Sequence, residues 1–142
     1  MRETENCPES GDGRSEPILS APGIRYHLDA SGIVRTTLSG TITANDLIAH
    51  SLARAAAGHL PRRQIVDARG ARLALSTEDV KRIAALSKEL RQRGPVGSTA
   101  FVAFDDLAFG MARMFSAYIA DGTFEVFRTI PEAEAWHWAV RG

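Results

Sequence analysis

The sequence predicts an α/β domain in which a mixed, five-stranded β-sheet packs against about four helices. Short β-prone apolar runs alternate with segments whose apolar residues recur at helical spacing. Two of these runs follow each other directly near the start, which gives the element order ββαβαβαβα. Helical crossovers between strands force parallel pairing, whereas the initial two strands form an antiparallel hairpin. A length of 142 residues suits one domain.

The first 20 or so residues are predicted to form a flexible N-terminal tail, and the domain is expected to span residues 21–142. The tail is rich in Glu, Ser, Gly and Pro and has almost no large apolar side chain before Ile18. It therefore cannot bury enough surface to offset the entropy lost on ordering. Cys7, the only cysteine, lies in this segment, which excludes an internal disulfide and indicates a reducing compartment.

A hairpin and a helix are expected next. Two extended runs, residues 24–29 and 33–40, flank a turn-forming Asp-Ala-Ser-Gly stretch. The first helix is predicted from about residue 43 to residue 57, since Thr43 and Asp46 form a variant of the capping box. Its apolar side is assigned to Leu47, Ile48, Ser51, Leu52 and Ala55.

The third strand is predicted within residues 63–69, ending near Asp67, and a short loop leads from it to the second helix. Ser76 and Asp79 repeat the helix-start signal, and the second helix ends before Gly94. The fourth strand, residues 98–104, is the most uniformly apolar run and is placed in the middle of the sheet.

A third helix, a fifth strand and a short C-terminal helix complete the chain. The third helix is predicted over residues 106–120, the fifth strand over 124–128, and the last helix begins near Pro131. The apolar stripe of the third helix is assigned to residues within an arc of roughly 100° at 3.6 residues per turn. These residues are Leu107, Met111, Met114, Phe115 and Tyr118.

Composition excludes several classes of protein. Apolar residues at 44% and charged residues at 24% are ordinary globular values. The 17 basic and 17 acidic residues balance, so no net field draws the chain to nucleic acid. No apolar run approaches the roughly 18 to 20 residues of a membrane helix, and the N-terminus lacks the apolar region of a signal peptide. These features predict a cytoplasmic protein without an integral membrane segment.

The motifs resemble those of small bacterial SpoIIAA-like proteins, the STAS/SEC14 branch of the STAS superfamily. The resemblance covers about residues 24–138. It lies in the order and spacing of LSGTITANDL, IVDARGARLALSTEDV, VAFDDLAFGMARMF and EVFRTIPEAEAWHW. The resemblance implies a STAS-like fold and, as in some members, a homodimer, but no established reaction. Structural relatives bind partner proteins, nucleotides or hydrophobic ligands, so the fold does not define the function.

Ser76 is a candidate phosphorylation site by this resemblance. In anti-sigma factor antagonists of the wider superfamily, a serine at the start of the helix after the third strand is phosphorylated, and Ser76 occupies that place. The neighbouring residues differ from the D-S-S-G-like stretch of those proteins, and a phosphate would meet Glu78 and Asp79 in the same helical turn. The alternative is that Ser76 is an N-cap contributing about 1 kcal/mol.

Polar residues at the predicted strand exits form a candidate ligand site, because ligands of open α/β sheets bind outside the carboxyl ends of parallel strands. The set consists of Asp67, Arg69, Arg72, Asp105, Asp106, Arg128 and Thr129. Asp67, Arg69, Asp105, Asp106 and Arg128 are its principal candidates. Their spacing matches no metal or phosphate motif, and Asp and Arg are also ordinary loop residues.

No catalytic constellation or metal motif is recognisable in the sequence. The four histidines lie on separate predicted elements without metal-binding spacing, and no G-x-S-x-G elbow indicates a hydrolase. The glycines near residues 94–97 precede a strand and therefore cannot present the N-terminus of a helix to a phosphate. The sequence thus predicts a protein that is not an enzyme and needs no metal or cofactor.

The third helix carries a candidate contact surface formed by Phe109, Met111 and Met114. Phe109 projects nearly opposite the predicted apolar stripe, and a helix that is apolar on both sides often touches something beyond its own sheet. That contact could be a second copy of the chain or an apolar ligand, and the alternative is a phenylalanine packed beneath a neighbouring loop.

The function expected from these patterns is a noncatalytic regulatory or small apolar-ligand-binding module. The alternative is a partner-switching protein, similar to an anti-sigma factor antagonist, that is regulated by phosphorylation of Ser76. A protein partner or an apolar small molecule is expected rather than nucleic acid.

Overall fold

The computed structural model describes residues 15–140. Within these residues one sheet contains the strands β2 (Ile18–Ala21), β3 (Ile24–Leu28), β4 (Val34–Thr43), β5 (Gln64–Ala74), β6 (Thr99–Val102) and β7 (Phe124–Phe127). The helices are α1 (Ala44–Ala56), α2 (Thr77–Arg93), α3 (Asp106–Ile119) and α4 (Ile130–Val140). No helix in the described part of the chain is both long enough and apolar enough to cross a membrane.

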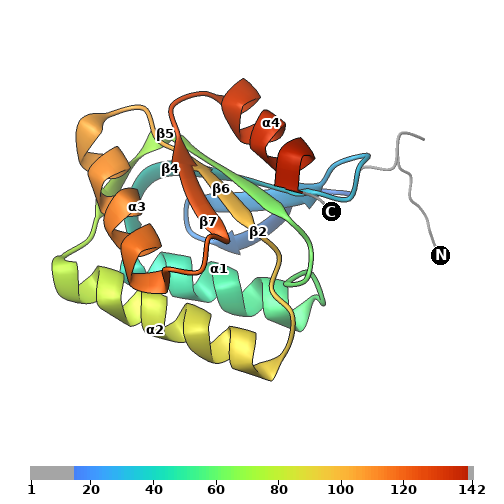
Figure 1. Ribbon diagram of the computed structural model, residues 1–142, viewed down its shortest axis with the longest axis horizontal. Helices are drawn as coiled ribbons and strands as arrows, with labels where there is room; N and C mark the ends of the chain where they lie inside the picture. The colour runs from blue at the N-terminus through green and yellow to red at the C-terminus, as the bar shows by residue number, and fades with distance from the viewer. Residues whose placement is uncertain (1–14, 141–142) are drawn as a thin grey trace.

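The strands follow one another across the sheet in the order β2-β3-β4-β5-β6-β7 (Figure 1). The first three strands pair antiparallel and β4 to β7 pair parallel, as expected for a hairpin followed by helical crossovers. The α/β class, the mixed sheet and the four helices are confirmed for the described residues. The strand number is wrong, because the described sheet has six strands. The additional strand is Ile18–Ala21, and its first three residues lie in the segment predicted to be the tail.

Strand β5 is longer than the sequence predicted. It does not end near Asp67 but continues to Ala74 and pairs with β4 as far as Thr43, with a register shift between Thr37 and Ser39. Asp67 pairs with Val102, the last residue of β6. The last residues of β6 and β7 therefore lie level with Asp67 of β5, and β4 and β5 continue beyond this point.

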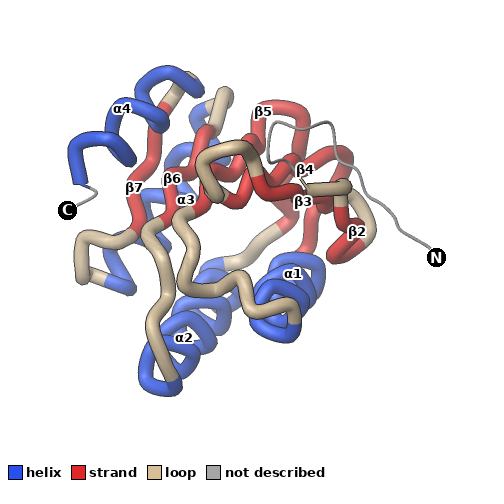
Figure 2. Tube along the Cα trace, turned by 90° about the vertical axis from the view of Figure 1, so that its right-hand side faces the viewer, coloured by secondary structure: helices blue, strands red, loops and turns tan. Residues whose placement is uncertain are grey.

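Helices cover both faces of the sheet. The helices α1, α2 and α3 lie on one face, and α4 lies alone on the other (Figures 1 and 2). The larger core, on the face with three helices, includes Ile24, Leu38, Ile42, Val66 and Phe101. The smaller core, which contains an α4 residue, consists of Ile33, Ile65, Ala100, Val102 and Ala133.

The first two helices start at the predicted capping signals, and α3 starts at a cap that was not predicted. Thr43 and Asp46 form a reciprocal capping box at α1, and Ser76 and Asp79 form a second at α2. Asp105 caps α3 by accepting a hydrogen bond from the backbone N–H of Ala108. Each cap satisfies backbone donors that the first helical turn leaves free, so these sequence signals fix where each helix leaves the sheet.

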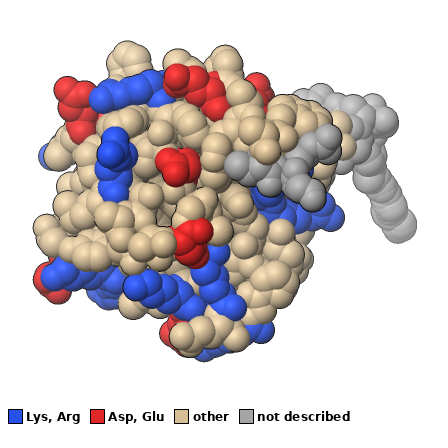
Figure 3. All heavy atoms as spheres, viewed as in Figure 1, with Lys and Arg blue, Asp and Glu red and all other residues tan. Residues whose placement is uncertain are grey.

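The surface carries charges of both signs. A row of basic side chains runs along the lower edge of the face shown in Figure 3, over α2, with acidic side chains beside it. Two basic residues of α2 form ion pairs within the helix, Lys81 with Glu78 and Arg93 with Glu89. The row is therefore a solvated helix surface with local charge pairing.

Candidate functional site

A pocket of about 130 Å³ lies between the sheet and the three helices of the larger core. It exists because α2 packs mainly against α1 and α3 rather than against the strands. The inner side of α2 consequently faces a space instead of a strand. Five side chains of this helix line that space, namely Val80, Ile83, Ser87, Leu90 and Arg91.

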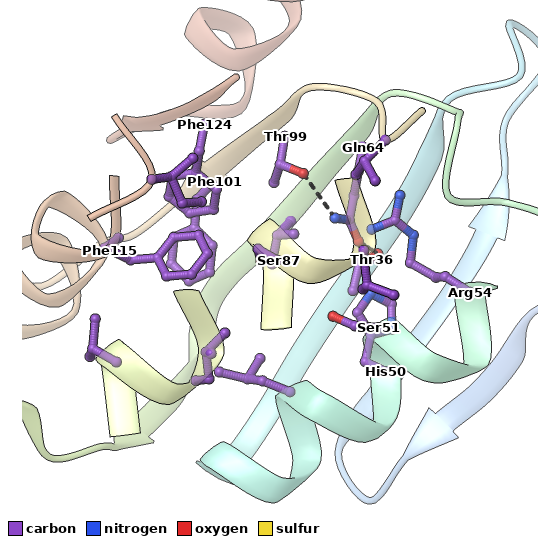
Figure 4. Close-up of a pocket in the computed structure, with 18 of the residues that line it drawn as sticks. Thr36, His50, Ser51, Arg54, Gln64, Ser87, Thr99, Phe101, Phe115 and Phe124 are labelled. Atoms are coloured by element: carbon purple, nitrogen blue, oxygen red, sulfur yellow. Dashed lines mark hydrogen bonds between the residues drawn. The ribbon is translucent and has the colours of Figure 1, made fainter. Parts of the chain in front are cut away.

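One end of the pocket is aromatic. The side chains of Phe101, Phe115 and Phe124 line it and contact one another (Figure 4). The ring centroid of Phe124 lies 4.6 Å from that of Phe115 in an edge-to-face arrangement and 5.8 Å from that of Phe101. These rings come from α3, β6 and β7, and they offer apolar surface shaped for another ring.

The other end of the pocket is polar, with a hydrogen-bond network centred on Gln64. The hydroxyl of Thr36 donates to Gln64 Oε1 over 2.7 Å, and His50 Nε2 lies 2.8 Å from the same oxygen. Gln64 Nε2 donates to Thr99 Oγ1 over 3.2 Å, as the dashed line in Figure 4 marks. Because Gln64 Oε1 only accepts, Nε2 of His50 carries the proton, and Nδ1 accepts from the Ser20 hydroxyl 2.8 Å away.

Two arginines also line the pocket, and their surroundings differ. Arg91 Nε lies 3.4 Å from Asp121 Oδ2, an ion-pair distance without hydrogen-bond geometry. Arg54 is only 4% exposed, and its Nε is buried without a hydrogen-bond partner. Its Nη2 makes one long bond of 3.4 Å, to the backbone oxygen of Arg62. Among residues 15–140, no carboxylate forms an ion pair with Arg54.

Burial shifts the pKa of both basic groups at the polar end. It lowers the pKa of His50 to about 4; the hydrogen bond to Gln64 opposes this shift and the nearby Arg54 charge adds to it. Burial also lowers the pKa of Arg54 to about 10, an effect that neighbouring Tyr26 partly opposes. At neutral pH the imidazole is therefore uncharged and the guanidinium is charged, so the polar end carries a positive charge.

The sequence interpretation missed this polar end because the side it assigned to α1 includes the pocket-lining Leu47 and Ser51 but leaves out His50 and Arg54. The buried residues of α1 are Ala44, His50 and Arg54, whereas Leu52, assigned to the apolar side, is 49% exposed. The helical spacing of Leu47, His50 and Arg54 could have indicated the site. These three residues lie on one side of the helix, where two polar side chains follow an apolar side chain.

The predicted ligand residues on β5 lie outside this pocket. Arg69 donates through Nε and Nη2 to the two carboxylate oxygens of Asp67, at 2.8 Å each. The pair lines a shallow surface groove beside Phe104, whose ring is exposed. The Asp67 carboxyl has a pKa below its usual value, chiefly because of the Arg69 hydrogen bonds.

The predicted residues near α3 form a second polar group. Arg128 donates to the Phe104 backbone oxygen over 2.9 Å and to Asp106 Oδ1 over 2.8 Å. Asp105 points into the helix as its cap. The structure thus brings Asp106 and Arg128 together in one ion pair and Asp67 and Arg69 in another, and each charge has a partner within the chain.

Arg128 also covers Phe109. Its guanidinium carbon lies 4.1 Å from the centroid of that ring, in a cation–π contact, and the ring packs against the larger core. The predicted apolar stripe of α3 is confirmed only in part: Met111 and Phe115 line the pocket, whereas Leu107 is 66% exposed, and the fully buried residues of the helix are Ala108, Ala112 and Ile119. Phe109 therefore lies beside the buried side rather than opposite it.

The two methionines of the predicted contact surface lie in different places. Met111 lines the pocket and packs against the larger core, whereas Met114 is half-buried. The sequence-derived surface thus contributes one side chain to the pocket. A homodimer formed through this helix stays a prediction.

Ser76 lies at the surface as the N-cap of α2. Its hydroxyl accepts from the Asp79 backbone N–H over 3.1 Å, and Asp79 Oδ2 accepts from the Ser76 N–H over 3.0 Å. The expected cap is confirmed. Among the described residues, no group of three or more His, Cys, Asp or Glu side chains is arranged to hold a metal ion.

Comparison with known proteins supports the fold. No protein-family model and no curated protein matches the sequence. The structure is similar to that of an uncharacterized protein of the DUF3478 family with a SpoIIAA-like fold from Shewanella loihica PV-4. The two chains are 16% identical, the match covers 73% of this chain and 82% of the other, and the TM-score is 0.50. The chain therefore has a SpoIIAA-like fold.

Proposed function

We propose that the protein is a noncatalytic module that binds a small, largely apolar ligand in the pocket between the sheet and α1, α2 and α3. The pocket itself is the observation that carries this proposal. Protein interiors seldom leave space larger than a water molecule. A pocket of about 130 Å³, lined largely by apolar side chains, is therefore a feature that close packing alone does not explain.

The size and lining of the pocket indicate what class of ligand fits. An apolar cavity of about 150 Å³ accepts a benzene-sized molecule. The pocket here is slightly smaller and has three phenylalanines at one end. A single ring or a short branched chain therefore matches it, whereas a long acyl chain does not.

The noncatalytic part of the proposal is supported by the polar network. Gln64 is engaged by Thr36, His50 and Thr99, and the second ring nitrogen of His50 is engaged by Ser20. Because these side chains are hydrogen-bonded to one another, they are suited to form a rigid wall of a binding site. A general base, in contrast, needs a free position facing its substrate.

Thermal unfolding tests the proposal. Toluene, which is neutral and has a single ring, is expected to raise the melting temperature in a saturable way, because it binds only the native state. Ser87→Leu places an isobutyl group in the pocket and is expected to abolish the shift. Ala85→Leu, on the exposed side of α2, is the matched control and should retain it. The proposal is wrong if no ring-sized compound, neutral or charged, gives a shift that Ser87→Leu removes.

A further inference from the structure

Arg54 is a buried charge that nothing in the described chain balances. The described side chain whose electrostatic effect favours its charge is Tyr26, which is neutral at physiological pH and whose hydroxyl bonds Nδ1 of His59. His50, on the same helix, is uncharged because of its own burial. A buried charge without a partner is strongly unfavourable, and such charges in proteins are normally paired. The missing partner is therefore an anion.

The position of Arg54 places that anion at the polar end of the pocket. Arg54 lines the pocket, and the Ser51 hydroxyl lies on the same side of α1 one turn earlier (Figure 4). The aromatic residues Phe101, Phe115 and Phe124 lie toward the other end, with Thr99 between the two ends. The pocket thus combines one cation with apolar surface for one ring.

We propose that the ligand is a small aromatic or branched-chain monocarboxylate whose carboxylate pairs with Arg54 and whose apolar body packs among Phe101, Phe115 and Phe124. This inference rests on the proposed ligand-binding function and specifies its ligand class. A guanidinium matches a carboxylate in charge and in its planar, two-donor geometry.

A monoanion matches this site better than a dianion does. Arg91, the other cation in the lining, is already beside Asp121. A phosphate dianion would therefore bring a second negative charge into the pocket without a partner, which low-dielectric surroundings disfavour. A volume of about 130 Å³ is large enough for one ring but too small for a long-chain fatty acid.

The test compares phenylacetate with phenylacetamide, its neutral isostere, by calorimetric titration of the wild-type protein at pH 8. Phenylacetate is expected to bind about tenfold tighter or more, the ratio typical of a hydrogen bond to a charged group. Arg54→Met should abolish this preference while leaving phenylacetamide binding unchanged, and Arg54→Lys should retain part of it. Arg82→Met, an exposed arginine of α2 that bonds Asn45, is the charge-matched control and should keep the preference.

The outcomes separate this inference from the proposed function. Equal affinity for the two compounds in wild type, or a preference for phenylacetate that survives in Arg54→Met, overturns the carboxylate inference but leaves the apolar pocket intact. Binding of neither compound, together with no melting shift that Ser87→Leu removes, overturns both. Because the wild-type comparison needs no variant, the inference is decided even where a variant does not fold.

Discussion

At the residue scale, Arg54 combines a position in the core with a permanent charge. Burial lowers its pKa only to about 10, so it remains protonated at neutral pH. Residues that weaken the free protein are typical of functional sites, where binding requires a group that folding alone would not favour. The pocket and the uncompensated guanidinium occur together, so a single anionic ligand would both occupy the pocket and balance the charge.

The first prediction concerns the stability of the protein without ligand. Arg54→Met is expected to raise the free energy of unfolding by about 1 kcal/mol or more, because an apolar side chain of similar length needs no counter-ion. Arg91→Met, in the same pocket lining, should bring no gain, since Arg91 already lies beside Asp121. Urea unfolding with an unchanged m-value measures both effects. A larger loss of stability for Arg54→Met than for Arg91→Met would contradict the account of Arg54.

At the scale of the element, helix α2 determines whether the pocket exists, and its start is fixed by Ser76. The Ser76 and Asp79 capping box holds the helix where β5 ends. Glu78 and Asp79 already supply negative charge to the first turn. A phosphate on Ser76 would be added beside them and would replace the hydroxyl in the cap, which favours a structural role for Ser76 over the partner-switching alternative.

The second prediction tests that structural role. Ser76→Ala is expected to cost about 1 kcal/mol of stability because the Asp79 N–H loses its acceptor. Ser76→Asp should preserve stability, since a carboxylate also caps a helix. Thr77→Ala, one position into the helix, is the control and should have little effect on urea unfolding. If Ser76→Asp abolishes binding to a protein partner that tolerates Ser76→Ala, the phosphorylation hypothesis becomes the better one.

The sequence predicted the elements of this chain better than their orientation. The capping boxes at Thr43 and Ser76 are local signals, and both helices begin where those signals indicated. Tertiary packing decides which side of a helix is buried. The spacing of apolar residues does not reveal that side when some of the buried residues are polar. On α1 the buried side includes His50 and Arg54, so an apolar-side assignment chose Leu52 instead.

The pocket was even less accessible to sequence reasoning. The pocket exists because α2 packs against α1 and α3 and not directly against the strands. No local sequence pattern encodes the distance between a helix and a sheet. The hydrogen bonds of Gln64 join residues far apart in the sequence, Thr36 and Thr99 among them. The continuation of β5 past Asp67 was missed for a similar reason, because it depends on pairing with the second half of β4.

At the scale of the whole molecule, the polar network joins parts of the fold that the sheet alone does not hold together. Ser20 lies on the edge strand β2, His50 on α1 and Gln64 on β5. The contacts at 2.8 Å on either side of the His50 ring connect these three elements. His137 connects α4 from the opposite face, since its Nε2 lies 2.8 Å from the Gln64 backbone oxygen. Two buried histidines therefore help to hold both helical layers to β5.

The third prediction follows from the pKa of His50, which is about 4 in the folded protein against an ordinary value of 6.5. As the pH falls, the unfolded chain takes up this proton first. Stability from His50 is therefore complete above pH 6.5 and is lost between pH 6.5 and 4. From pH 7.5 to pH 5 the loss is about 2 kcal/mol by this linkage. Protonation would also place a hydrogen on Nδ1, which accepts the Ser20 hydroxyl in the neutral form.

Urea unfolding at pH 7.5 and at pH 5, in wild type and in His50→Gln, measures this contribution. The variant is expected to be less stable at pH 7.5 but to lose about 2 kcal/mol less than wild type on acidification, because glutamine does not titrate. Some pH dependence should remain, since burial also lowers the pKa of His59 and His137. His27→Gln, outside the network, should keep the full wild-type dependence. Equal losses in wild type and His50→Gln would show that the proton is taken up elsewhere and that the network does not couple pH to folding.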